Sequence, residues 1–201
     1  MQLLDRYGVV TREAVLAEGV RGGYASVYGV LKVLEERGAS RRGYFVSGLG
    51  AAQFGLPGAV DRLRSARVSA DGAFDAEFHP ERQAAPVVLA ATDPAQPYGA
   101  TVPWPESPGR PARSASALVV LRDGLPLVWF DRRGHHVVTF PAATDDHGWA
   151  PTLAALVKEG HARTVEVRKV DGDPLAPTSS WADVLRAAGF VDGYRGLVAR
   201  G

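Results

Sequence analysis

The stretch YASVYGVLKVLEERGASRRGYFV, residues 24–46, changes at Gly38 from a helical to an extended pattern. Before this glycine, apolar residues recur with helical spacing, which predicts a helix over residues 24–37 with Gly38 as its C-cap. The residues that carry the spacing are Val27, Val30, Leu31 and Leu34. After it, residues 41–46 and 51–54 predict two strands joined by a turn. A helix followed by a β-hairpin is the second half of a winged-helix fold.

The residues before this stretch predict two further helices. Residues 2–7 give a short helix, and Thr11 can cap a second helix that Gly19 stops. Beyond the hairpin, Pro57 opens another helix, to about residue 66, which has one apolar and one basic face. Three helices and a two-stranded hairpin make a winged helix, a variant of the helix-turn-helix, and we place this domain at residues 1–67.

The winged-helix topology predicts which side chains would contact nucleic acid. The third helix of such a module lies against a groove with its N-terminal residues closest to the bases, and the wing lies beside it. The candidates are Arg21, Tyr24, Ser26, Tyr28 and Lys32 on the helix side and Arg41, Arg42 and Tyr44 on the wing. The helix side chains Tyr24, Ser26, Tyr28 and Lys32 include few types that read base edges, so binding to the phosphate backbone is favoured over sequence readout. The alternative is a module that only packs against protein.

Charge separates the first third of the chain from the rest. Residues 1–67 hold ten Arg or Lys and six Asp or Glu, a net charge of +4, whereas the remainder holds thirteen against sixteen, a net charge of −3. A positive small domain is what phosphate binding needs, because neutralising phosphates releases counterions. A genome rich in arginine codons would give the same excess, so the charge agrees with phosphate binding without requiring it.

The second part of the chain predicts a β-rich domain. Residues 68–84 are polar and aperiodic and predict a linker, and residues 85–201 predict the domain. Strands are expected at 86–91, 116–122, 126–130, 136–140, 164–170 and 194–200, with helices at about 149–159 and 181–188. This order predicts an α+β protein in which a winged helix precedes a small antiparallel β-barrel with interposed helices. A long proline-rich loop over residues 93–99 and 103–111 is expected either to cover the mouth of the barrel or to contact a neighbouring domain, and disorder over residues 105–114 is the alternative.

Several classes of site are not expected from the composition. The chain has no cysteine, and its five histidines show no metal-binding spacing, so no metal site is expected. The phosphate loop and the Asp-Glu-x-His segment of an ATPase motor are not found, so no cofactor is expected in this chain. No apolar run suits a membrane span and no signal peptide is seen, so we expect a cytoplasmic protein.

Several long, ungapped segments resemble the C-terminal region of the large bacterial Lhr-type helicases. They include RRGYFV at 41–46, GLGAAQF at 48–54, LPGAVDRLR at 56–64, AATDPAQPYG at 90–99 and AGFVDGYRG at 188–196. The resemblance implies an ATP-dependent DNA-repair helicase whose C-terminal region holds tandem winged helices and a barrel similar to that of AlkZ-type DNA glycosylases. It implies DNA, upstream winged helices and a helicase core as partners, with the motor itself outside this chain.

Two alternatives to a DNA-binding and assembly role remain open. A glycosylase acting on uracil or alkylated bases needs a carboxylate beside an extruded base, and Asp192, next to Tyr194 and Arg195, is the first candidate. However, Asp-Gly is an ordinary turn signature, and Gln53 lacks the second glutamine of the AlkZ-type motif. The other alternative is a scaffold that forms homo-oligomers through exposed Trp104, Trp129 or Phe140.

Overall fold

The computed structural model describes residues 1–50, 52–65 and 84–201. The chain divides into two compact units, Met1–Asp75 with Pro97–Pro103 and Ala76–Gln96 with Trp104–Gly201. We call them the winged-helix unit and the C-terminal unit and describe each by itself. Of the predicted linker 68–84, residues 68–83 lie outside the described residues, so the predicted domain boundaries remain predictions.

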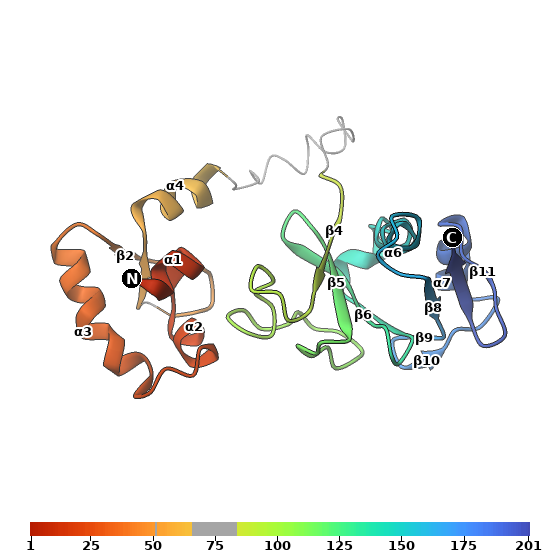
Figure 1. Cartoon of the computed structure of the whole chain (residues 1–201), viewed down its shortest axis with the longest axis horizontal. Helices are drawn as coiled ribbons and strands as arrows, with labels where there is room; N and C mark the ends of the chain where they lie inside the picture. The colour runs from red at the N-terminus through yellow and green to blue at the C-terminus, as the bar shows by residue number, and fades with distance from the viewer. Residues whose placement is uncertain (51, 66–83) are drawn as a thin grey trace. The chain divides into compact units, whose positions relative to one another are not determined.

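Four helices form in the winged-helix unit (Figure 1). They are α1 (Gln2–Tyr7), α2 (Arg12–Ala17), α3 (Gly23–Glu36) and α4 (Pro57–Ser65). The predicted cap of α2 is present, because the Thr11 hydroxyl accepts a hydrogen bond from the Ala14 amide at 3.1 Å. All four helices lie within a residue or two of their predicted positions.

The sheet of this unit has one strand more than predicted. Its order is β1-β3-β2, all antiparallel, with β1 at Val9–Val10, β2 at Arg41–Gly43 and β3 at Gln53–Gly55. Gly8, at φ 68°, ends α1 and turns the chain so that two β-branched valines reach the edge of β3. A hairpin after three helices confirms the winged-helix prediction, and β1 completes its sheet.

The core of the unit lies between the helices and this sheet. Its buried members are Leu4, Val10, Val15, Leu31 and Phe54. Phe54 comes from β3 and is fully buried. The central strand is thereby fixed against α3, which places the wing beside that helix.

The C-terminal unit contains two separate sheets. A six-stranded sheet has the order β10-β9-β7-β6-β5-β4, and a three-stranded sheet has the order β11-β12-β8. The strands of the first are β4 (Val87–Ala90), β5 (Ala117–Arg122), β6 (Leu125–Asp131), β7 (His136–Thr139), β9 (Lys169–Val170) and β10 (Asp173–Pro174). Those of the second are β8 (Thr164–Val167), β11 (Val191–Asp192) and β12 (Leu197–Arg200). The predicted meander is confirmed as β5-β6-β7.

The predicted barrel is wrong, because neither sheet closes on itself. The single strand expected at 164–170 is two strands in different sheets, β8 and β9. The break falls at Arg168, where the amides of Arg168 and Lys169 both donate to the His135 carbonyl, at 2.8 and 3.2 Å. β9 then pairs with β7 in parallel over only two residues, so the all-antiparallel expectation is also wrong. Each sheet therefore keeps two open edges, and a closed barrel has none.

Helices α6 (Trp149–Lys158) and α7 (Ser180–Ala187) complete the C-terminal unit, after a short 3-10 helix, η2 (Pro141–Thr144). Figure 1 shows α6 and α7 in the part of the unit that holds the three-stranded sheet. The two helices join both sheets around one core, in which Trp149, Leu153 and Leu185 are fully buried. The two predicted helices are thus confirmed. Their apolar faces, and not the interior of a barrel, form the core together with the two sheets.

Residues 104–114, in and after the proline-rich loop, pack within the C-terminal unit. The Arg113 guanidinium donates to the carbonyls of Asp93 and Gln96, and the Trp129 indole donates to the Ala112 carbonyl at 2.9 Å. These contacts argue against disorder over 105–114. The Trp104 ring stacks on Phe140 with centroids 5.8 Å apart. Because Trp129 and Phe140 are buried, with 7% and 2% of their surface exposed, they are not exposed subunit contacts as the scaffold hypothesis expected.

His136 on β7 makes the stability of this unit sensitive to pH. Its Nε2 atom accepts a hydrogen bond from the Gly172 amide at 3.0 Å, which requires the neutral ring. Burial lowers the pKa of His136 below its ordinary value of 6.5. A lowered folded-state pKa means that the unfolded chain takes up the proton first, so this contribution is present above pH 6.5 and is lost as pH falls.

We therefore expect the urea midpoint of the C-terminal unit to decrease between about pH 7.5 and about pH 5.5. His136→Gln should flatten this dependence, since glutamine keeps an acceptor but does not titrate. Exposed His161 offers a control, and His161→Gln should leave the slope unchanged. An equal slope in the wild type and His136→Gln would show that His136 is not the titrating group.

Candidate nucleic-acid interface

A glycine pair sets the start of α3, the helix predicted to face nucleic acid. Gly22 and Gly23 have φ values of 82° and 59°, a region that side chains with a Cβ rarely adopt. The turn they make follows the exposed residue Arg21 and leads directly into the helix. Arg21 is thus presented at the N-terminal end of α3, as predicted.

The two tyrosines of α3 lie partly inside the unit rather than fully outward. The Tyr24 hydroxyl donates to the Ala52 carbonyl at 2.5 Å. The rings of Tyr28 and Phe54 pack edge to face, with their centroids 5.9 Å apart. Burial is the main reason that the pKa of Tyr24 is raised. Both side chains connect α3 to β3 and its preceding loop, so their first role in the structure is to position the wing.

The exposed side of α3 is mostly small or apolar. It carries Ala25, Ser26, Gly29, Val30, Lys32, Val33 and, at the end of the helix, the acidic Glu36. The Ser26 hydroxyl donates to the Gly23 carbonyl of its own helix at 2.8 Å, so its hydrogen is already used. Lys32 supplies the positive charge on this side. Such a surface offers few groups for reading base edges, in agreement with the backbone-binding prediction.

The wing is fixed by one buried glutamine. The Gln53 carbonyl oxygen accepts from the amides of Phe45 and Val46, at 2.9 and 2.8 Å. Its amide nitrogen donates to the carbonyls of Val46 and Gly50, both at 2.8 Å. This side chain is completely buried and replaces the backbone ladder beyond Gly43. The strand predicted to reach residue 46 therefore ends at Gly43.

The cations of the wing lie on opposite faces of β2. Arg42 is paired with Phe54 of β3 and so shares the face that looks toward α3, whereas Arg41 is paired with Gly55 on the other face. Both arginines are exposed, and Tyr44 just beyond them is 79% exposed. The fixed wing thus presents the three predicted side chains to solvent.

Arg12 belongs to the same surface and was not predicted. Its guanidinium carbon lies 5.8 Å from the centre of the Tyr24 ring, a cation–π arrangement. The charges of Arg42 and Arg12 both oppose the rise in the Tyr24 pKa, so both lie within electrostatic reach of that hydroxyl. Helical spacing could not reveal Arg12, because α2 and α3 meet only through tertiary packing. Tyr24 therefore brings together one predicted and one unpredicted arginine.

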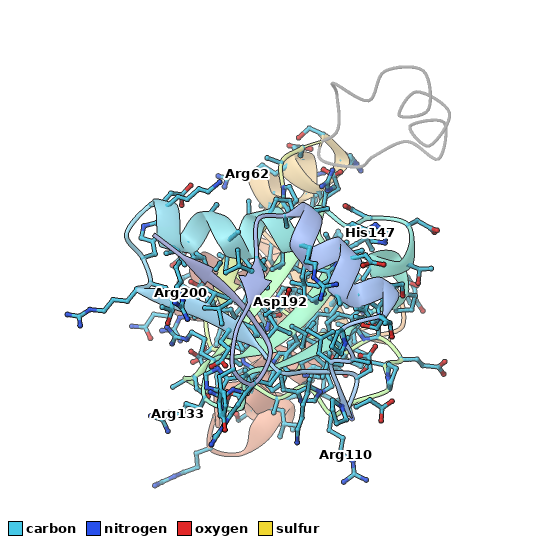
Figure 2. All side chains as sticks on the ribbon, turned by 90° about the vertical axis from the view of Figure 1, so that its right-hand side faces the viewer. Arg62, Arg110, Arg133, His147, Asp192 and Arg200 are labelled. Carbon is cyan, nitrogen blue, oxygen red and sulfur yellow. The ribbon has the colours of Figure 1, made fainter. Side chains whose placement is uncertain are left out.

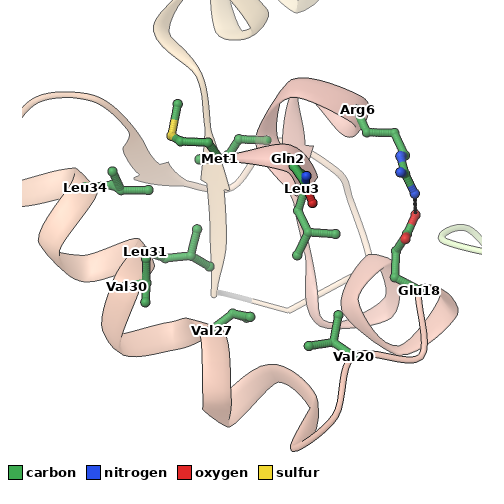
Figure 3. Close-up of a pocket in the computed structure, with 11 residues that line it drawn as sticks. Met1, Gln2, Leu3, Arg6, Glu18, Val20, Val27, Val30, Leu31 and Leu34 are labelled. Carbon is green, nitrogen blue, oxygen red and sulfur yellow. Dashed lines mark hydrogen bonds and ion pairs between the residues drawn. The ribbon is translucent and has the colours of Figure 1, made fainter.

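A second surface of the winged-helix unit is an apolar groove of about 480 Å³ between α1 and α3 (Figure 3). Its walls include Leu3, Val27 and Val30. At its rim, Arg6 pairs with Glu18 at 2.5 Å, and the Tyr7 hydroxyl donates to the same carboxylate at 2.6 Å. The hydrogen bonds from Tyr7 and then Arg6 lower the pKa of Glu18. The groove has few polar groups and is unlike a phosphate-binding surface.

Asp192, the candidate catalytic carboxylate, lies on β11 in the C-terminal unit, on the side facing the viewer in Figure 2. Its carboxylate pairs with Arg186 at 2.8 Å and is 73% exposed. Solvent and an arginine thus surround it, rather than the enclosed pocket that an extruded base would need. This environment favours the turn interpretation that the sequence left open.

The described parts of the chain contain neither a group of metal ligands nor a membrane-spanning helix. Within residues 1–50, 52–65 and 84–201, no three His, Asp or Glu side chains gather as metal ligands would. No helix in these same segments is long and apolar enough to cross a bilayer.

Comparison with known proteins agrees with the fold of the first unit. Residues 1–73 match the family model of the winged-helix domain of large helicase-related proteins. The chain is 44% identical, over 98% of its length, to the Lhr helicase/probable uracil glycosylase of Mycolicibacterium smegmatis. It is 34% identical, over 97% of its length, to the Lhr helicase/uracil glycosylase of Escherichia coli K12. The chain spans only 13% and 12% of the length of these relatives. The first 73 residues are therefore a winged-helix domain of the Lhr family, and the whole chain corresponds to one segment of an Lhr-type helicase.

Proposed function

We propose that this chain is a non-catalytic DNA-binding region of an Lhr-type helicase, which holds the phosphate backbone through the wing and the adjoining ends of α2 and α3. The observation that supports it best is the cluster of Arg12 and Arg42 around Tyr24, beside exposed Arg41 on a wing that Gln53 fixes. Fixed cations bind phosphate with a smaller entropy cost than mobile ones. The proposal assigns ATP hydrolysis and DNA repair to the parent helicase and not to this chain.

The chemistry of the surface favours backbone contact over sequence recognition. Arginine forms paired hydrogen bonds with phosphate oxygens, and Arg12 and Arg42 both lie near Tyr24, with Arg41 on the other face of the same strand. The exposed side of α3 contributes one lysine and no Asn, Gln or Arg. Affinity should then depend strongly on salt and weakly on base sequence.

The double substitution Arg41→Ala, Arg42→Ala tests this proposal. Loss of two phosphate contacts should lower the slope of log K against log salt by about two and weaken duplex binding by about tenfold at moderate salt. Fluorescence anisotropy with a labelled duplex, titrated with salt, measures both quantities. The double substitution Arg62→Ala, Arg64→Ala removes the same charge from the exposed side of α4 and serves as the control.

Two results would contradict the proposal. One is binding by the wild type that does not change with salt, and the other is an equal loss in the control and the wing variant. The second would mean that net charge alone, and not the wing, is responsible. Binding that is lost only in the wing variant would also exclude a winged helix that serves solely for protein packing.

The names of the two relatives include a uracil glycosylase, but the geometry of this chain does not favour that activity. Asp192 is its best carboxylate candidate, and it is exposed and paired with Arg186. A glycosylase must enclose an extruded base beside its carboxylate. The described geometry therefore supports the binding role better than the catalytic one.

A further inference from the structure

The three-stranded sheet of the C-terminal unit has one face in the core and one face outside it. Residues Val165, Val167, Leu197 and Ala199 point into the core, where α6 and α7 pack. Alternation then places Thr164, Glu166, Val198 and Arg200 on the other face, in register across β8 and β12. Arg200 and Thr164 are exposed there.

Two glycines allow the turn between β11 and β12 to pack closely against this sheet. The Gly193 amide donates to the Gly196 carbonyl at 2.7 Å, which closes the turn. A Cβ on Gly196 would lie 2.1 Å from the Val167 carbonyl oxygen, and one on Gly193 would lie 2.7 Å from Val198. Because the base of the turn fits so closely, Tyr194 and Arg195 between the glycines are held at its outer tip.

Tyr194 is 97% exposed, the highest value among the large apolar and aromatic side chains described. Its ring contacts the Arg195 guanidinium, whose carbon is 5.9 Å from the ring centre. An aromatic ring so exposed adds nothing to the core, yet the turn beneath it is rigidly packed. A flat ring and a cation, side by side on a fixed support, form a surface suited to a base and its phosphate.

The charge around the turn also favours a polyanion. Asp192 is matched by Arg186 at 2.8 Å and Glu166 by Arg168 at 2.5 Å. The hydrogen bond from Arg168 is the main cause of the lowered pKa of Glu166. Arg186 also pairs with Asp183 at 3.5 Å, so Arg168, Arg186, Arg195 and Arg200 exceed the three carboxylates Glu166, Asp183 and Asp192 by one positive charge.

We propose that the turn of Gly193–Gly196 is a contact site for single-stranded nucleic acid, in which Tyr194 stacks on an unpaired base and Arg195 and Arg200 contact phosphates. A single strand fits better than a duplex, because the faces of paired bases are covered by their neighbours. A nucleic acid offers a flat base and a phosphate in every nucleotide, which matches the adjacent ring and cation of the turn. This site lies in the C-terminal unit and does not depend on the wing.

The test uses the full chain with fluorescently labelled oligo-dT, oligo-U and a DNA duplex. Stacking of one base on an aromatic ring is worth about 1–3 kcal/mol, so Tyr194→Ala should weaken single-strand binding by roughly 5- to 150-fold. Tyr194→Phe keeps the ring and should bind within about twofold of the wild type. Duplex binding should be unchanged by either substitution. The two single strands distinguish DNA from RNA as the source of the base.

A bromouracil-containing oligonucleotide gives a second readout, because irradiation should cross-link it to Tyr194. Unchanged single-strand binding by Tyr194→Ala, together with a cross-link elsewhere, would overturn the proposal. So would a change in sedimentation of Tyr194→Ala without any change in nucleic-acid binding, which would indicate a protein contact. The wing variant Arg41→Ala, Arg42→Ala tests the other site, so the failure of one proposal is distinguishable from the failure of the other.

Discussion

Gln53→Met should lower the free energy of unfolding of the winged-helix unit by about 4 kcal/mol. The substitution keeps the volume of the side chain but removes all four of its hydrogen bonds, two as acceptor and two as donor. Each bond contributes a net of about 0.5–1.5 kcal/mol, and the four partners are backbone groups that then lack their protein partner. No other side chain described in the unit satisfies as many backbone groups.

The four tryptophans all lie beyond residue 103, so fluorescence does not report on this unit. Amide hydrogen exchange of Phe45 and Val46 is the direct measurement, because both amides donate to Gln53. We expect both amides to exchange much faster in Gln53→Met. Gln2→Met makes the same chemical change at an exposed position of α1 and is the matched control. Protection that survives in Gln53→Met would mean that the wing is fixed by other contacts.

The same substitution connects stability to the proposed function. If the wing binds phosphate because it is held in place, its release should weaken duplex binding although every arginine remains. The loss should approach that of the Arg41→Ala, Arg42→Ala variant. Binding at full strength by Gln53→Met would separate the charge of the wing from its conformation.

Local patterns predicted most of the winged helix. Apolar spacing and the Thr11 cap located α2 and α3, because these features are set by neighbouring residues. β1 was missed, since two valines between helices form a strand only when β3 is present to pair with them. The wing strand was predicted too long for the same reason, because the partner of Phe45 and Val46 is the side chain of Gln53, eight and seven residues away.

The candidate site was predicted in part. Arg41, Arg42 and Tyr44 are exposed on the wing, where the hairpin pattern placed them. Tyr24 was expected as an exposed contact, but its hydroxyl is bound to Ala52, since an amphipathic side chain can lie at the border of a core. The position of Arg12 beside Tyr24 depends on the packing of α2 against α3, which the spacing of apolar residues along a helix does not reveal.

The barrel failed as a prediction because alternation alone cannot show where a strand changes sheets. Residues 164–167 alternate, but Arg168 and Lys169 are consecutive polar residues before Val170, and the His135 carbonyl accepts from both of their amides at this break. A pattern of side chains gives the faces of a strand and not its partner. The closure of a sheet therefore remained outside what the sequence could decide.

Because residues 164–170 are divided, the short strand β9 is held to β7 partly by Asp171, which follows it. Asp171→Ala should therefore destabilise the C-terminal unit by about 4 kcal/mol. Its carboxylate accepts from the Thr139 amide at 2.7 Å and from the Thr139 hydroxyl at 2.8 Å. Hydrogen bonds to a charged acceptor contribute about 1.5–3 kcal/mol each. Asp171 also has a φ of 56°, a conformation that costs alanine more than aspartate or asparagine.

Three variants separate these contributions in urea unfolding followed by tryptophan fluorescence. Asp171→Gly loses the hydrogen bonds but relieves the backbone, so it should be less destabilised than Asp171→Ala by about 1 kcal/mol. Asp171→Asn keeps an acceptor and tolerates the conformation, so about half of the stability should return. Thr139→Val loses only the hydroxyl bond. Because these bonds join β7 to the turn after β9, a small effect of Asp171→Ala would show that the two-residue parallel pairing holds the sheet edge by itself.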